Sequence, residues 1–370
     1  MSFKPLFARA LGAAPDRLHL AAHSHHLWPD ASFAGQVACW EDAARLADSK
    51  WDKVMGEVWP AAQAEVAAEL GHGDPSTIVF SSNTHDFILR LAAACPRRAG
   101  GPLRVLTSDG EFHSARRQFA RWVESGEILL DTVAAEPFDD FGPRFLAAAK
   151  AGTHDLIMVS QVLFGSGRLF GEVDALASLA QEAGPWVVVD GYHAFMAVEA
   201  PLSPAAASRA FYLGGGYKYA MSGEGMAFLH CPPGFGPRPP LTGWYAEFDD
   251  LSLPPGMVGY APDAMRFMGA TFDPSALPLP RSAGDAGRGG PDDGPHFGAR
   301  GGAAIAAGRL ACRDRARLGR AAEPARRRTP RPLPRLPIAA GGGLVFGACG
   351  SGIHHRRARR RAADRPRALP

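Results

Sequence analysis

An aspartate at the end of an apolar strand and an isolated lysine are the residues best suited to chemistry in this sequence. The run WVVVD ends in Asp190, and His193 follows three residues later. A buried carboxylate needs a partner, and the protonated ring nitrogen of a cofactor is one such partner. Lys218 follows in YLGGGYKYAMSGEG, behind three glycines and between two tyrosines. Glycines allow close approach of a ligand, and a partly buried lysine with a lowered pKa can form an imine.

Each of these motifs also has an ordinary structural explanation. An aspartate at a strand end is structural more often than catalytic, and a lone lysine after glycines can lie on a flexible surface loop. The strand-end aspartate, the histidine at the third position after it and the glycine-rich Tyr-Lys pair occur together here. Their combination favours a cofactor site.

The elements that must position these residues alternate between strand and helix patterns. Short apolar runs bounded by Gly, Pro or polar residues predict buried strands at 77–80, 104–108, 156–160, 186–190, 209–214 and 225–230. Helical patterns lie between them at 87–94, 114–125 and 173–184, the last closed by Gly184. The alternation predicts an α/β fold, a mostly parallel sheet sandwiched by helices, with ligands bound beyond the carboxyl ends of the strands.

Cysteine usage and hydropathy point to a protein of a reducing compartment. Five cysteines are scattered without close pairs, which argues against a disulfide framework or a zinc site. The first twenty residues lack the apolar run and cleavage site of a signal peptide, and no segment is apolar enough to span a membrane. We therefore expect a cytoplasmic protein without a membrane partner.

The last ninety residues differ sharply from the rest. Residues 281–370 hold 20 arginines, no lysine and 6 acidic residues, and they lack helical or strand periodicity. One interpretation is a disordered basic tail, a composition that often binds nucleic acid. A second arises because a shifted reading of the codons from residue 277 permits a helical pattern with charges of both signs. Our hypothesis is that 277–370 is a frameshifted, non-native tail, and we expect no nucleic-acid partner.

The motifs between Asp190 and Lys218 resemble those of the class V aminotransferase-like enzymes, which depend on pyridoxal 5′-phosphate (PLP). Within that group they are most similar to kynureninase. The resemblance covers roughly residues 18–276. It implies fold-type I architecture, with an N-terminal arm (1–20), a PLP-binding large domain (21–250), the start of a linker or C-terminal domain (251–276) and a C-terminal small domain that is missing or corrupted in 277–370.

The resemblance also implies roles for individual residues. Lys218 would hold PLP as a Schiff base, Asp190 would pair with the pyridine nitrogen, and His193 would pack near the cofactor. Tyr217 would be the acid or base that assists bond cleavage. Catalytic roles therefore fall on Lys218, Tyr217 and Asp190.

The residues that would bind the phosphate and cover the ring of the cofactor lie in other segments. Asn83 and Thr84 open a helix and would bind the phosphate, because a helix N-terminus is an anion site; an ordinary helix cap is the alternative. In EFHSARR the resemblance places Phe112 on the pyridine ring and Ser114 near the phosphate, although the aspartate of the family pattern falls on Ala115.

Two further segments suggest a homodimer. Trp244 in GWYAEF and Thr271 in FMGATFDP resemble residues that serve a phosphate across a subunit interface, although both could be core or loop residues. AAHSHHLWP (21–29) holds three histidines in four positions, but no carboxylate or cysteine has matching spacing for zinc. We expect this segment to line the substrate pocket and expect no metal.

The function implied is PLP-dependent chemistry on a small-molecule substrate, an amino acid. Kynureninase-like hydrolysis of kynurenine to alanine and anthranilate is the leading hypothesis. Another class V aminotransferase or lyase activity is the alternative, and cysteine desulfurase is disfavoured because Cys312 and Cys349 lie in the suspect tail. A non-catalytic product of a frameshifted gene, or a basic-tailed binding protein, represents a different class.

Overall fold

The computed structural model describes residues 4–98, 100–248 and 252–277. All of them belong to the first of two compact units into which the chain divides, Met1–Ala321. The hypotheses about residues 278–370, including the frameshift, the basic tail and the two late cysteines, concern residues outside these ranges.

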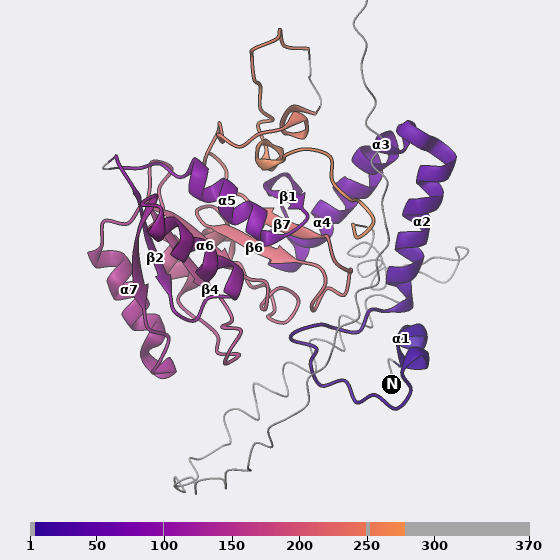
Figure 1. Ribbon diagram of the computed structural model, residues 1–370, viewed down its shortest axis with the longest axis horizontal. Coiled ribbons are helices and arrows are strands. Elements are labelled where there is room, and N and C mark those ends of the chain that lie inside the picture. Colours follow the sequence, from indigo (N-terminus) through magenta and orange to yellow (C-terminus); the bar gives the residue numbers. More distant parts are fainter. Residues whose placement is uncertain (1–3, 99, 249–251, 278–370) are drawn as a thin grey trace, which may run out of the picture. The chain divides into compact units, whose positions relative to one another are not determined.

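A seven-stranded mixed sheet forms the centre of the described part (Figure 1). Its spatial order is β1-β7-β6-β5-β4-β2-β3. The strands are β1 (Ile78–Ser81), β2 (Leu103–Ser108), β3 (Ile128–Val133), β4 (Leu156–Ser160), β5 (Trp186–Asp190), β6 (Phe211–Gly215) and β7 (Ala227–His230).

The sheet is parallel except at β7. Strands β2 to β6 pair in parallel with their neighbours, and β7 runs antiparallel to both β6 and β1. A helix crosses over between each successive pair of strands from β1 to β6, as parallel pairing requires. Between β6 and β7 there is no helix, only the loop that contains Lys218. The α/β class and the mostly parallel sheet predicted from the sequence are confirmed.

Helices surround this sheet. They are α1 (Ala8–Ala13), α2 (Asp30–Leu46), α3 (Lys50–Lys53), α4 (Trp59–Leu70), α5 (Thr84–Ala94), α6 (His113–Glu124), α7 (Phe141–Ala151), α8 (Val173–Ala177) and α9 (Pro204–Ala207). Helices α5 and α6 contact each other and lie over the strands in Figure 1. Every residue of β4, β5 and β6 is buried, so both faces of the sheet centre are covered, as in other parallel sheets.

Strand β3 and helix α8 differ from the sequence prediction. Strand β3 was missed because it is an edge strand whose burial pattern is mixed, so its apolar run ILL stops at Asp131. The helix predicted at 173–184 ends at Ala177. The Ser178 hydroxyl donates to the carbonyl of Ala175, and the Gln181 N–H donates to the carbonyl of Pro185, so the helical ladder does not continue. Gly184 ends the following turn with φ +95°.

No helix among the described residues is long and apolar enough to cross a membrane.

Candidate active site

The carboxyl ends of the central parallel strands meet at one edge of the sheet. Ser108 ends β2, Ser160 ends β4, Asp190 ends β5 and Gly215 ends β6. Because parallel strands end on the same side, the side chains that follow them converge there. This edge holds the residues that the sequence singled out between Asp190 and Lys218.

Lys218 is buried at this edge, with 4% of its surface exposed. Its Nζ donates a hydrogen bond of 2.6 Å to Nε2 of His193. Three aromatic rings surround the ammonium group, with centroids 4.9 Å away for Tyr192, 5.2 Å for Phe112 and 5.6 Å for Tyr217. No carboxylate of the described residues forms an ion pair with this lysine.

This environment makes both Lys218 and His193 easy to deprotonate. Burial lowers the pKa of Lys218 to about 8, while the charge of Asp190 acts in the opposite direction. Burial, followed by the charge of Lys218, lowers the pKa of His193 to about 3. The imidazole is therefore neutral at neutral pH, and its Nε2 accepts the hydrogen bond from the Lys218 amine. A lysine of this kind can act as a nucleophile or a base.

Asp190 is buried and has an oxygen available for a ligand. Its Oδ1 accepts the backbone N–H of Tyr192 at 3.0 Å, and no hydrogen bond from the described residues reaches Oδ2. Burial raises the pKa of this carboxyl, while the Tyr192 hydrogen bond and the charge of Lys218 lower it. A cationic ring nitrogen would satisfy the free oxygen.

The glycines before Lys218 serve protein packing, which differs from the close ligand approach inferred from the sequence. A Cβ on Gly214 would lie 2.3 Å from the ring of Phe228, and one on Gly215 would lie 2.4 Å from the ring of Tyr192. A Cβ on Gly216 would meet the hydroxyl of Ser222. These glycines thus let side chains close around the base of the lysine loop.

Tyr217 lies at the edge of the site, and its ring centroid is 5.5 Å from that of Tyr192. Burial, with a smaller effect from the charge of Glu224, raises the pKa of its hydroxyl. The phenol is therefore protonated at neutral pH and can donate a proton. Its role as an acid or base stays a prediction.

Phe112 and Ser114 lie at the start of α6. Phe112 is the N-cap of that helix, and its ring approaches both Lys218 and His193. Ser114 lies in the first turn of α6 and is partly buried. Ala115, at the position of the family's aspartate, is buried with 1% of its surface exposed. The structure thus brings Phe112 close to the lysine. The next buried residue of this segment, Ala115, has no polar group.

Asn83 and Thr84 occupy the N-terminus of α5, as expected. The Asn83 Oδ1 accepts the backbone N–H of Asp86 at 3.0 Å, so this side chain caps the helix. That is the structural alternative considered for the motif. Phosphate binding by the two residues stays a prediction.

Among the described residues, no hydrogen bond, ion pair or ring contact joins Trp244 or Thr271 to Lys218. Trp244 is 41% exposed and packs on Tyr245, with ring centroids 4.1 Å apart. Thr271 is exposed. An exposed tryptophan is compatible with a contact to a second subunit, as the resemblance implies. This dimer role of Trp244 stays a prediction.

Two residues of the site were not identified from the sequence. The ring of Tyr192 faces Lys218, and Glu111 is a fully buried carboxyl near Asp190. Both lie next to residues that the sequence singled out, Tyr192 between Asp190 and His193, and Glu111 directly before Phe112. Their position beside those residues was the available signal, but which of these side chains point inward depends on the tertiary fold.

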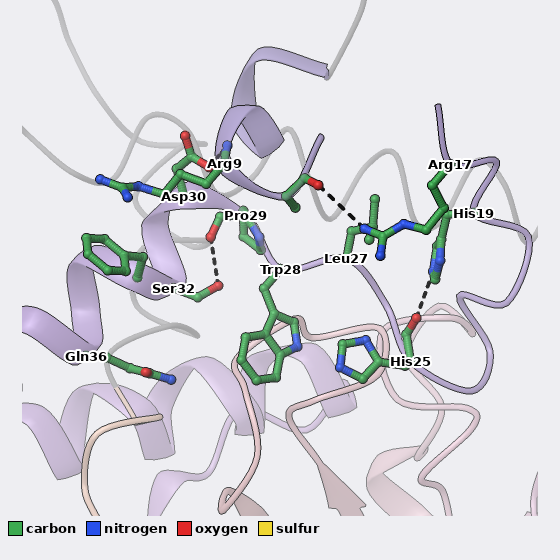
Figure 2. A pocket seen from close by; sticks show the side chains of 12 residues that line it. Arg9, Arg17, His19, His25, Leu27, Trp28, Pro29, Asp30, Ser32 and Gln36 are labelled. Atoms are coloured by element: carbon green, nitrogen blue, oxygen red, sulfur yellow. Dashed lines mark hydrogen bonds between the residues drawn. The ribbon is translucent and has the colours of Figure 1, made fainter. Parts of the chain in front are cut away.

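Part of the histidine-rich segment lines a pocket, but that pocket includes none of the residues around Lys218, so a role at the substrate stays a prediction. The pocket has a volume of about 700 Å³ and is lined by His25, Leu27, Trp28 and Pro29, together with side chains of the N-terminal arm and α2 (Figure 2). His25 stacks on Trp28, with ring centroids 5.4 Å apart, and lies 6.2 Å from the ring of Tyr217. In the part of the chain that the structure describes, no cluster of His, Cys, Asp or Glu could hold a metal ion.

Solved structures share this arrangement of sheet and helices. The cystine C–S lyase C-DES, in complex with its product cysteine persulfide, matches with a TM-score of 0.59 at 16% identity, over 70% of this chain and 69% of the lyase. A C-DES variant described with glycine covalently linked to the PLP cofactor gives 0.58 at 16% identity, covering 75% and 71%. The cysteine desulfurase CsdA from Escherichia coli gives 0.52 at 16% identity, covering 72% and 69%. The chain has the fold of the fold-type I PLP-dependent enzymes.

The chain is also similar in sequence to an epimerase. Isopenicillin N epimerase from Streptomyces clavuligerus is 28% identical over 221 residues, which are 57% of this chain and 54% of the epimerase. The chain thus matches about half the length of this relative. No protein-family model matches the sequence. These findings support the class V aminotransferase-like resemblance in its broad form and do not show kynureninase in particular.

Proposed function

We propose that this chain binds PLP through Lys218 and belongs to an enzyme that acts on the α-carbon of an amino acid. The observation that carries the proposal is the buried Lys218, with a pKa lowered to about 8, hydrogen-bonded to a neutral His193 and surrounded by aromatic rings. The fold shared with PLP enzymes supports it.

The residues present fit the cofactor. Lys218 would hold it covalently, Asp190 would accept a hydrogen bond from its protonated ring nitrogen through the free Oδ2, and Phe112 would cover the ring. Asn83, Thr84 and Ser114 are the candidates for the phosphate. When bound, PLP supplies an electron sink for charge that develops at the α-carbon.

The side chains of the site then divide the remaining work. Lys218, released by the substrate amine, takes the α-proton, and its low pKa favours this role near neutral pH. His193 holds the lysine amine in place through Nε2. Tyr217, whose raised pKa keeps it protonated, donates a proton to the group that leaves or rearranges.

Among class V reactions we favour an epimerase or a lyase that needs no cysteine nucleophile. The chain is similar in sequence to an epimerase and in fold to a C–S lyase. Of the cysteines that the structure describes, Cys95 and Cys231 are buried, and burial raises the pKa of Cys231 to about 12. Burial also raises the pKa of Cys39. A desulfurase mechanism is therefore less suited to this part of the chain.

The test uses the full chain with PLP in deuterated water. Exchange of the α-proton, followed by nuclear magnetic resonance, reports any reaction that begins at Cα. Cystine, kynurenine and single enantiomers of amino acids then distinguish sulfur release, anthranilate release and inversion. Anthranilate release from kynurenine would select the kynureninase-like reaction. A chain that neither takes up PLP nor exchanges an α-proton would refute the proposal as a whole.

The broken-gene hypothesis is a second proposal, based on the composition of residues 281–370. If the native C-terminal domain is missing, the described part should bind PLP but turn over substrate poorly. Resequencing the gene and restoring the frame near codon 277 should then recover activity. Absence of an alternative open frame at that point would refute this hypothesis.

The pH dependence of PLP attachment tests the environment of Lys218. Only the neutral amine reacts with an aldehyde, so a lowered pKa makes the reactive form abundant at lower pH. The rate of borohydride-trappable attachment should rise with pH and reach half its maximum near pH 8. A midpoint near the ordinary lysine value of about 10.4 would show that the lysine is solvated.

We also propose a homodimer with the active site near the subunit interface. The exposed Trp244 and Thr271 suit contact with a second subunit. Sedimentation of the PLP-loaded chain should give the mass of a dimer. A monomer with full cofactor occupancy would contradict this proposal.

A further inference from the structure

Glu111 is a fully buried carboxyl that has no role in the proposed mechanism. It lies between β2 and α6, with 0% of its surface exposed. The Ser108 hydroxyl donates to Oε1 at 2.5 Å, and the Ser160 hydroxyl donates to Oε2 at 2.5 Å. A buried carboxyl is tolerated only with such partners. Both of its oxygens are therefore engaged within the protein.

The two serines belong to the ends of adjacent parallel strands. Ser108 is the last residue of β2, and Ser160 is the last residue of β4. Ser160 is also the register partner of Asp190 on β5. The N–H of Gln161, the next residue, donates to the Asp190 carbonyl at 2.9 Å. Glu111 thus joins β2 to the strand end against which Asp190 is paired.

Glu111 also directly precedes one of the three aromatic residues that surround the lysine. Phe112 follows it in the chain, and its ring centroid lies 5.2 Å from Nζ of Lys218. The two serine hydrogen bonds hold the carboxyl of Glu111 and therefore restrict the conformation of the turn that carries Phe112. One side chain restrains two parts of the site, the aspartate and the ring.

The electrostatics agree with this placement. Burial raises the pKa of Glu111 to about 7, the two serine hydrogen bonds lower it, and the charge of Asp190 raises it. The two carboxyls are therefore close enough to affect each other. Asp190 has an oxygen available for a ligand, whereas Glu111 does not.

We propose that Glu111 is a positioning residue of the PLP site, which holds the strand end beside Asp190 through Ser160 and the ring of Phe112 through the chain. This inference rests on the proposed function, since it assumes that Asp190 and Phe112 contact PLP. Glu111 acts through these residues and does not itself touch the cofactor.

The test compares variants of the full chain by PLP affinity and by the pH midpoint of the bound cofactor's visible absorbance. Glu111→Ala and Ser160→Ala each break the link to β4, and both should raise the Kd for PLP, by about tenfold or more for Glu111→Ala. Both should also displace the pH midpoint. Glu111→Gln keeps the shape and one acceptor oxygen, so its Kd should change less than about threefold.

Asp155→Asn is the matched control. Asp155 is also a buried carboxyl, 1% exposed, but it precedes β4 at the opposite end and accepts the N–H groups of Arg98 and Arg104. This change should lower the melting temperature and leave the Kd and the pH midpoint of the folded protein unchanged. A purely structural role for Glu111 would give the same pattern.

The outcomes separate the two proposals. Wild-type Kd and pH midpoint in both Glu111→Ala and Ser160→Ala would overturn the positioning role while the proposed function stands. If Glu111→Ala fails to fold, Ser160→Ala decides the matter, because it removes a single hydroxyl. Failure of the wild-type chain itself to bind PLP would overturn the proposed function, and the inference with it.

Discussion

Replacement of Lys218 with alanine is expected to abolish covalent attachment of PLP. Lysines are rare in this sequence, and Lys218 is the one that the fold buries beside Asp190, His193 and aromatic rings. After borohydride reduction and proteolysis, the wild-type chain should carry the label on the peptide containing residue 218. The variant should carry no label, because the methyl side chain of alanine has no amine that could form an imine with PLP.

The same change should also reduce turnover strongly. A positioned acid or base contributes about 10²–10⁴-fold to a rate, and Lys218 is the proposed base at the α-carbon. Exchange of the α-proton into deuterated water should fall by at least this factor. Lys150→Ala is the control, since Lys150 is exposed at the end of α7, and it should retain both labelling and exchange. Labelling that persists in the Lys218 variant would remove the basis of the proposed function.

Asp190→Asn is expected to separate cofactor attachment from catalysis. Lys218 is still present, so borohydride should still trap PLP. The amide cannot balance a protonated ring nitrogen, and an unpaired buried charge costs about 3–5 kcal/mol. At about 1.36 kcal/mol per tenfold, α-proton exchange should fall by roughly 10²-fold or more.

A second measurement on the same variant needs no turnover. The charge of Asp190 raises the pKa of Lys218, so its removal should lower the pH midpoint of PLP attachment below about 8. Asp155→Asn is again the matched buried carboxyl and should leave this midpoint in place. Near-normal exchange and an unchanged midpoint in Asp190→Asn would mean that the ring nitrogen has another partner.

The sequence by itself determined the features that depend on neighbouring residues. Continuous apolar runs identified β4 and β5 to the residue, because both faces of these strands are buried and local composition records that. Asp190, His193 and Lys218 were recognisable because they lie at fixed positions after such strands. The α/β class followed from the alternation of these patterns.

Other features were decided by the tertiary structure, because they arise between residues far apart in the chain. Edge strand β3 is defined by its partner β2 and not by its own composition. Glu111 and Ser160 are 49 residues apart, and only the adjacent strand ends of β2 and β4 bring them together. The purpose of the glycines before Lys218 was likewise hidden, since the rings that fill the space above them come from β7 and from the turn after β5. Parallel strands converge at one edge whatever their order in the sequence, and that convergence makes the site.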